Sequence, residues 1–171
     1  MKNDWKADLA RYGGYRAFFR EQSIYCIALY RCGRGIEGIK SALLKKIVSI
    51  PYYLAFRLIE TLFSTSLPKE AVIGKGLRIW HFGQIFINPD VVIGDNCTLR
   101  QGVTLGNKVD GGGSPKIGNN VEFGAHSMVL GKVEIGNNCT IGAMTLVNKD
   151  VPDNCIAIGI PAVIKQKSEK I

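Results

Sequence analysis

A six-residue repeat runs through the sequence from Ile73 onward and constrains the fold more than any other feature. Each unit begins with Ile, Leu, Val or Phe, often followed by Gly, and the fifth residue is usually Val, Cys, Ser or Thr. The units are IGKGLR, IWHFGQIF, INPDVV, IGDNCT, LRQGVT, LGNKVD, IGNNVE, FGAHSM, VLGKVE, IGNNCT, IGAMTL and VNKDVP. A fixed period of this kind indicates a repeat architecture.

The repeat predicts a parallel β-helix, in which each hexad supplies one short strand and one corner. The first residue is expected to point inward and stack on its equivalents, with the smaller fifth residue also facing inward. Gly, Asn and Asp suit the positive-φ turns at the corners. Backbone groups pair with the coils above and below, so the interior needs little polarity. Cys97 and Cys139 stand at fifth positions and are predicted to be packing residues.

The repeat also divides the chain. Residues 71–164 form the predicted β-helix domain, interrupted by a projecting loop at 106–116 that contains three consecutive glycines. Residues 1–70 are predicted to be a helical segment, since Ile24, Ile27, Ala28 and Arg31 recur at helical spacing. Residues 165–171 form a basic tail.

Charge and cysteine content restrict the partners of the 171-residue chain, whose net charge is +8. Residues 1–70 carry 12 basic and 6 acidic residues, so an anionic partner is expected there first. Five cysteines without a C-x-x-C pair favour a reduced cytosolic setting over disulfides or a metal site. The polar N-terminus predicts no signal peptide, and no nucleic-acid module is recognisable.

The hexads, with LRQGVTLGN and VPDNCIAIGIPAVI, resemble the left-handed β-helix hexapeptide acyltransferases. The resemblance is closest to the serine acetyltransferase-like branch, and within it to bacterial exopolysaccharide O-acetyltransferases of the colanic-acid type. The segment IYCIALYRCGRGI is similar to a helical Tyr-Arg segment of that branch. The resemblance implies a cytoplasmic homotrimer that transfers acetyl from acetyl-CoA to a hydroxyl without a metal, in active sites between adjacent subunits.

His81 is the candidate catalytic residue. It lies in IWHFGQIF, the one unit of eight residues, and it matches the general base of the related serine acetyltransferases. A neutral imidazole can take the proton of an attacking hydroxyl and then protonate the departing thiolate. Ser66 stands where the serine enzymes have the orienting carboxylate, and Asp90, Asp95 or a backbone carbonyl remain open as its replacement.

Two departures from the serine enzymes bear on the acceptor. Trp80 replaces an aspartate beside the catalytic histidine, and Ser114 stands where the family has a second functional histidine. The other histidine, His126, is expected to face outward. Both replaced groups would hold the charged ends of serine, so the pattern favours a saccharide acceptor contacted by Trp80 and Ser114.

The resemblance also implies a site for acetyl-CoA. Small residues at the corners would let the pantetheine arm approach the backbone, the 106–116 loop would act as a lid, and basic residues of the tail would meet the phosphates. The implied residues are Gly106, Asn107, Gly124, Ala125, Gly142, Ala143 and Lys165. A surface excursion for the loop and a solvated tail, with Lys165 and Lys167, are the alternatives.

Three functions remain open: a saccharide O-acetyltransferase of exopolysaccharide or capsule synthesis, a serine O-acetyltransferase, and a non-catalytic β-helix trimer. Residues 42–63 mix apolar residues with Lys45, Lys46 and Arg57. This composition fits packing against the β-helix or another subunit. It also fits peripheral contact with the inner face of the cytoplasmic membrane, where a lipid-linked acceptor would be carried.

Overall fold

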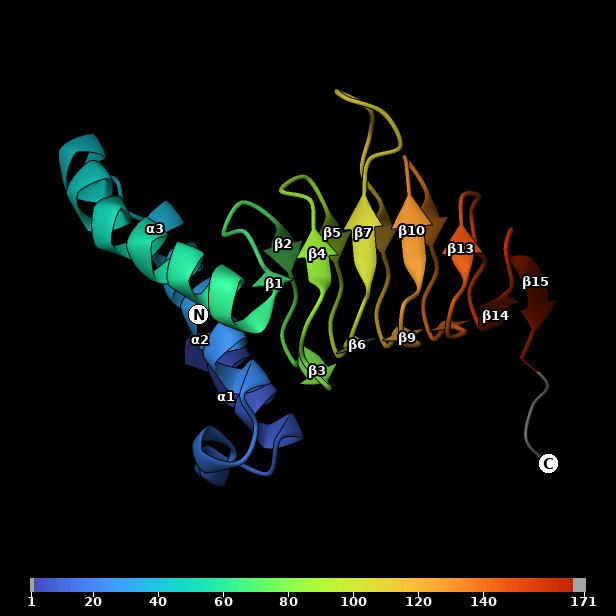
Figure 1. Ribbon diagram of the computed structural model, residues 1–171, viewed down its shortest axis with the longest axis horizontal. Helices are drawn as coiled ribbons and strands as arrows, with labels where there is room; N and C mark the ends of the chain where they lie inside the picture. Colours follow the sequence, from blue (N-terminus) through green and yellow to red (C-terminus); the bar gives the residue numbers. More distant parts are fainter. Residues whose placement is uncertain (1, 168–171) are drawn as a thin grey trace.

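A computed structural model describes residues 2–167, in which a helical segment precedes a three-sided parallel β-helix (Figure 1). The predicted fold class is confirmed. The helices are α1 (Lys2–Arg11), the 3-10 helix η1 (Tyr15–Phe19), α2 (Ser23–Glu37) and α3 (Ala42–Phe63). The first strand begins at Thr65, directly after the last helix, and residues 168–171 of the predicted basic tail lie outside the described residues.

The coils build three sheets. Sheet A contains β1 (Thr65–Ser66), β4 (Ile85–Ile87), β7 (Thr104–Gly106), β10 (Met128–Leu130) and β13 (Leu146–Val147). Sheet B contains β2 (Val72–Ile73), β5 (Val92–Ile93), β8 (Lys116–Ile117) and β11 (Glu134–Ile135). Sheet C contains β3 (Arg78–Trp80), β6 (Thr98–Arg100), β9 (Glu122–Phe123), β12 (Thr140–Ile141), β14 (Cys155–Ile158) and β15 (Val163–Gln166), the last pairing antiparallel with β14. We name the corners by the sheets that they join, as the C-to-A, A-to-B and B-to-C corners.

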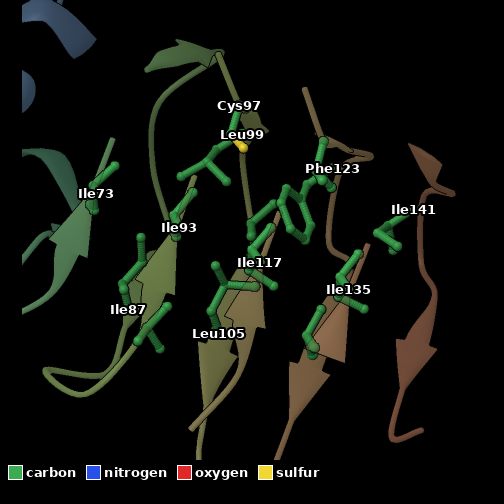
Figure 2. Packing of buried hydrophobic residues seen from close by; sticks show 14 of the residues in the cluster. Ile73, Ile87, Ile93, Cys97, Leu99, Leu105, Ile117, Phe123, Ile135 and Ile141 are labelled. Atoms are coloured by element: carbon green, nitrogen blue, oxygen red, sulfur yellow. The ribbon is translucent and has the colours of Figure 1, made fainter. Parts of the chain in front are cut away.

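The first residues of the hexads stack inside the β-helix as predicted (Figure 2). Ile87 pairs in register with Leu105, and Ile93 pairs with Ile117, so equivalent side chains contact one another from coil to coil. Cys97 is fully buried at a fifth position, and burial raises the pKa of its thiol to about 11. Cys139 is equally buried, and burial raises its pKa too. Both cysteines are therefore packing residues, as predicted.

Asparagines form the B-to-C corner. Asn120 and Asn138 both have φ of 57°, a conformation that Asn tolerates better than most residues. Their side chains form a ladder, in which Asn120 Nδ2 donates to Asn138 Oδ1 at 3.0 Å and Asn138 Nδ2 donates to Asn154 Oδ1 at 3.1 Å. The corner therefore satisfies its own polar groups from coil to coil.

The helices cap the open end of the β-helix, where the first coil has no coil above it. The Tyr30 hydroxyl accepts from the backbone N–H of Ile73 and donates to the carbonyl of Ala71, both at 2.9 Å. The Tyr12 hydroxyl accepts from the backbone N–H of Ile79 at 2.7 Å. Side chains thus replace the missing coil, which prevents the exposed edge from pairing with another chain.

A buried ion pair joins α1 and α2 to the same edge. Arg31 Nε donates to Asp8 Oδ2 at 2.8 Å, and neither side chain is more than 8% exposed. The Arg31 guanidinium also donates to the carbonyls of Ile73 and Gly74, and Asp8 Oδ1 accepts from the backbone N–H of Leu77 at 2.8 Å. Both charges therefore complete backbone hydrogen bonding of the first coil.

Candidate functional site

The irregular unit makes a two-residue bulge at the C-to-A corner of the first coil. Trp80 pairs with Arg100 before the corner, and Phe86 pairs with Thr104 after it. The first coil therefore takes six residue steps, from 80 to 86, around the corner that the second coil turns in four, from 100 to 104. The first coil thus contains two extra residues. The backbone N–H of Gly102 donates to the carbonyl of Gly83, which places the extra residues at 81 and 82. The bulge predicted from unit length is present, and His81 lies in it.

The two neighbours of His81 in the chain are held by aromatic contacts. The Phe82 ring packs edge-on against Phe63 at the end of α3, with ring centroids 5.5 Å apart. Trp80 has two guanidinium groups against its ring, those of Arg78 and Arg100, at 4.3 and 4.9 Å from the ring centroid. Between them, His81 has φ of 57° and an exposed side chain. The bulge thus presents the imidazole to solvent from a fixed backbone.

No group among residues 2–167 hydrogen-bonds the His81 ring. Asp95, considered as an orienting partner, accepts instead from the backbone N–H of Lys75 at the B-to-C corner. Asp90 lies at the A-to-B corner, where its N–H donates to Asn88. Ser66 makes no hydrogen bond to His81 either. Within one chain, none of the three candidates orients the imidazole.

Two cavities flank the bulge. The first, of about 340 Å³, is lined by Trp80 and extends over the outer face of sheet C. The second, of about 370 Å³, is lined by Phe82 and includes Phe63, Gln101 and His126. Gln101 Oε1 is buried there without a hydrogen-bond partner among the described residues. Trp80 and Phe82 directly precede and follow His81, so the bulge adjoins both cavities, and His81 itself lines neither of them.

Most of the predicted site residues share one edge of the β-helix. Gly124, Ala125, Gly142 and Ala143 follow β9 and β12 at the C-to-A corner, the corner that carries the His81 bulge. The carbonyl of Ala125 accepts from the backbone N–H of Met144 at 2.8 Å. A Cβ at Gly124 would collide with the backbone of Gly142 and Ala143. Gly124 is therefore required for the coils to stack, whether or not a ligand also approaches its backbone.

The remaining predicted residues lie elsewhere. Ser114 Oγ donates to Asn88 Oδ1 at 3.1 Å, and Asn88 Nδ2 donates to Asn107 Oδ1 at 3.4 Å, next to Gly106 at the A-to-B corner. The loop projects from this corner, at the end of the sheet A strands opposite to β3, β6 and β9 (Figure 1). One chain therefore does not bring Ser114, Gly106 and Asn107 together with His81.

The described part of the tail, residues 165–167, lies at the end of the β-helix away from the helices (Figure 1). Lys165, on β15, pairs with Ile156 and is exposed. Lys167 donates from Nζ to the carbonyl of Asn138 at 2.6 Å, which occupies its ammonium group. Of the two lysines, Lys165 is the one whose charge makes no hydrogen bond among the described residues.

Sequence reasoning missed Arg78 and Arg100, which line the first cavity with Trp80. The signal was available in the strand period, because side chains at alternate positions of β3 and β6 point to the same outer face. No group of three or more His, Cys, Asp or Glu in the described part of the chain is placed to hold a metal ion.

The comparisons with known proteins agree with this fold. Residues 114–149 match the family described as bacterial transferase hexapeptide (six repeats). The Escherichia coli K12 protein named "Putative colanic acid biosynthesis acetyltransferase WcaB" is 39% identical over 128 residues, covering 74% of this chain and 79% of that protein. A Staphylococcus epidermidis serine acetyltransferase is 38% identical over 145 residues, covering 80% of this chain and 68% of the relative.

Solved structures of serine acetyltransferases have the same fold. Neisseria gonorrhoeae serine acetyltransferase superposes with a TM-score of 0.79 at 26% identity, covering 99% of this chain and 67% of that one. The soybean apoenzyme gives 0.81 at 28% identity, with 96% and 68% covered. Fold and sequence together define an acyltransferase built on a β-helix. The chain belongs to the bacterial hexapeptide transferase family and is an acetyltransferase, similar both to WcaB and to the serine acetyltransferases.

Proposed function

We propose that the protein transfers acetyl from acetyl-CoA to a hydroxyl of a saccharide in bacterial exopolysaccharide or capsule synthesis, with His81 as general base. The observation that carries the proposal is the two-residue bulge, which exposes the imidazole of His81 between two residues, Trp80 and Phe82, that each line a cavity. The resemblance to WcaB supports the acceptor class, and a serine acetyltransferase in complex with CoA, 25% identical with a TM-score of 0.78 over 95% of this chain, supports the donor.

The chemistry needs only positioned groups of the chain. A hydroxyl is a weak nucleophile toward a thioester, and the imidazole takes its proton as the new C–O bond forms. The tetrahedral intermediate then collapses, the C–S bond breaks, and the imidazolium returns the proton to the coenzyme A thiolate. Backbone N–H groups near the corner are suitable donors for the oxyanion. The reaction is a direct transfer without a covalent enzyme intermediate.

We propose that a homotrimer brings together predicted site residues that lie apart in one chain. The predicted coenzyme-binding set is split between the C-to-A corner, with Gly124, Ala125, Gly142 and Ala143, the A-to-B corner, with Gly106 and Asn107, and Lys165 on β15. The predicted acceptor-binding residue Ser114 lies at the A-to-B corner too. Because the sheet A strands separate these corners, the loop of one subunit must meet the His81 corner of another. We propose that the active sites lie between subunits and that the group orienting His81 comes from the neighbouring subunit, since no described residue of the same chain hydrogen-bonds the ring.

The acceptor is tested by turnover. We would measure thiol release from acetyl-CoA with L-serine and with a panel of sugars and oligosaccharides, lipid-linked ones included. The proposal expects turnover on a saccharide and none on serine, since Trp80 and Ser114 lack the charges that would hold an amino acid. Turnover on serine would establish the second candidate, a serine O-acetyltransferase, which the similarity to those enzymes favours. No turnover on any acceptor would contradict both.

We further propose peripheral contact with an anionic membrane through α3. Six apolar residues recur along its outer side, and each is between 56% and 71% exposed. They are Leu43, Ile47, Ile50, Leu54, Leu58 and Leu62. A row of exposed apolar residues of this length is uncommon on a soluble protein and marks a contact site. None of the helices in the described range is long and apolar enough to span a bilayer, so this contact is interfacial.

Charge favours a membrane over a second copy of α3. Lys46 and Arg57 lie on the flank of the apolar side. Arg57 is paired with Glu60, whereas Lys46 has no ion-pair partner among residues 2–167. Two copies meeting through this face would bring like charges together, whereas anionic headgroups attract them at about 1 kcal/mol per basic residue. Contact of this kind would place the enzyme at the inner face of the cytoplasmic membrane, beside a lipid-linked acceptor.

Vesicle sedimentation tests the contact. The wild type is expected to bind phosphatidylglycerol vesicles, and the double variant Ile47→Ser, Leu54→Ser should bind at least about tenfold more weakly, because two large apolar side chains no longer enter the interface. Val109→Ser removes an equally exposed apolar residue from the loop and should change nothing. Equal binding by the double variant, or equal binding to neutral vesicles, would contradict the proposal.

A further inference from the structure

The first cavity contains an unusual concentration of guanidinium groups. Arg11, Arg78 and Arg100 line it together with Trp80, and Glu122 is the carboxylate in the lining. Arg11 has partners already, because it donates to the carbonyls of Gly76 and Cys97 and to Thr98. Arg78 and Arg100 have no ion pair among the described residues, and Glu122 has none either. The cavity therefore has three cations against one anion, and the two arginines beside Trp80 make no hydrogen bond among the described residues.

Trp80 holds these two cations against its ring, and all three side chains line the first cavity. Both guanidinium groups lie over its ring, and Arg100 is its register partner on the adjacent strand. Arg78 Nε is buried and lacks a hydrogen-bond partner among residues 2–167. A buried donor without a partner costs free energy, and in native structures it commonly marks a group that a ligand or water satisfies. The Trp80 ring thus serves to position the arginines, which leaves less of it free to lie against a sugar.

We propose that Arg78 and Arg100 bind an anionic group of the acceptor, a carboxylate or a phosphate attached to the sugar. The planar guanidinium fork matches both groups, and a pair of forks held in place recognises such an anion with little further ordering. Glu122, across the cavity, can accept hydrogen bonds from sugar hydroxyls. This inference rests on the proposed function, and it narrows the acceptor from a saccharide to an acidic or phosphorylated saccharide.

The phosphates of coenzyme A are a poor match for the arginine end of this cavity, whose other end is lined by Gly124 and Ala143 of the predicted coenzyme-binding set. The thioester must lie beside His81 for transfer, so the phosphates lie a full pantetheine arm away. If the arm follows the C-to-A corner to Gly142 and Ala143, it covers three coil spacings, or about 14 Å. The guanidinium groups beside Trp80 are therefore at the reacting end, where an anion belongs to the acceptor.

Binding can be measured without turnover through the fluorescence of Trp80. A Trp5→Phe background leaves Trp80 as the only tryptophan of the two in the chain. The probes are glucuronate for a carboxylate, glucose 6-phosphate for a phosphate, and glucose as the neutral control. We expect at least one acidic probe to bind about tenfold or more tightly than glucose, and the tighter of the two identifies the anion.

Substitutions test whether binding of the acidic probe depends on Arg78 and Arg100. Arg100→Gln and Arg78→Gln should each weaken binding of the acidic probe by about 10- to 100-fold, the loss typical of one charged hydrogen-bonding partner. Arg100→Lys keeps the charge without the fork and should lie in between. Arg57→Gln removes an exposed arginine from α3 and is the matched control, for which no change is expected. The affinity for coenzyme A should also stay unchanged in all four variants.

Several outcomes would overturn the inference. They are no saturable binding of either acidic probe, equal binding of glucose, and full binding by both glutamine variants. A loss of coenzyme A affinity in place of acceptor affinity would assign the arginines to the donor and also reject it. The binding assay contains no acetyl-CoA, so it does not depend on turnover. Binding of an acidic probe that the arginine substitutions weaken therefore supports the anion site even if no acetyl transfer is detected, which distinguishes this inference from the proposed function.

Discussion

Replacing His81 by alanine is expected to lower kcat for acetyl transfer by about 10²- to 10⁴-fold, the usual contribution of a general base. The substitution removes the proton acceptor while the anchored residues on either side, Trp80 and Phe82, keep the bulge in place. KM for acetyl-CoA should change little. Thiol release in steady state, with folding checked by circular dichroism, measures the effect.

His126→Ala is the matched control for this substitution. His126 lies at the same kind of corner two coils further on, with the same φ of 57° and an exposed side chain. It lines the second cavity, so it is available for contact with a ligand, but it has no counterpart of the bulge. We expect His126→Ala to retain kcat within about tenfold. A larger loss in His126→Ala than in His81→Ala would reverse the assignment of the base.

Asp8→Ala is expected to destabilise the protein by about 3–5 kcal/mol, the typical cost of breaking a buried ion pair. Asp8 is fully buried, and its removal leaves the Arg31 guanidinium without its anion and the backbone N–H of Leu77 without an acceptor. Both losses occur at the open end of the β-helix, where no other coil can replace them. Urea unfolding followed by circular dichroism gives the free energy.

The surface pair Arg57–Glu60 provides the comparison. Its nitrogen and oxygen atoms are 2.6 Å apart, close to the length of the buried pair, but the Arg57 side chain is 77% exposed. Exposed pairs contribute about 0–1 kcal/mol, so Glu60→Ala should alter stability by no more than that. An Asp8→Ala variant as stable as Glu60→Ala would show that the helices do not stabilise the first coil through this ion pair.

Capping also explains the helical Tyr-Arg segment. The side chains of Tyr30 and Arg31 both reach the backbone of the first coil, at Ile73 and its neighbours. Residues on α1, Asp8 and Tyr12, do the same for Leu77 and Ile79. The segment is therefore required to hydrogen-bond the backbone groups at the exposed edge of the first coil. This role is independent of any contact that α3 makes with a membrane or a neighbouring subunit.

The sequence by itself determined the β-helix and the position of His81. The hexad period fixes which side chains face inward, because a strand alternates its faces and Ile93 or Ile117 in the wrong register would be exposed. The eight-residue unit likewise fixes a bulge, since two residues without partners in the next coil must leave the wall. The inward-facing positions and the bulge both depend on the number of residues between stacked positions, so they can be predicted from the sequence alone.

Only the tertiary structure decided which distant residues meet. Stacking of successive coils places Arg100 beside Trp80, although 20 positions separate them, and packing of α1 and α2 on the first coil pairs Asp8 with Arg31. It also separates Ser114 from His81 by placing them at different corners. Contacts of this kind depend on how a three-sided coil returns to each corner and on which helix covers its end, and the spacing of residues along the chain does not contain that information.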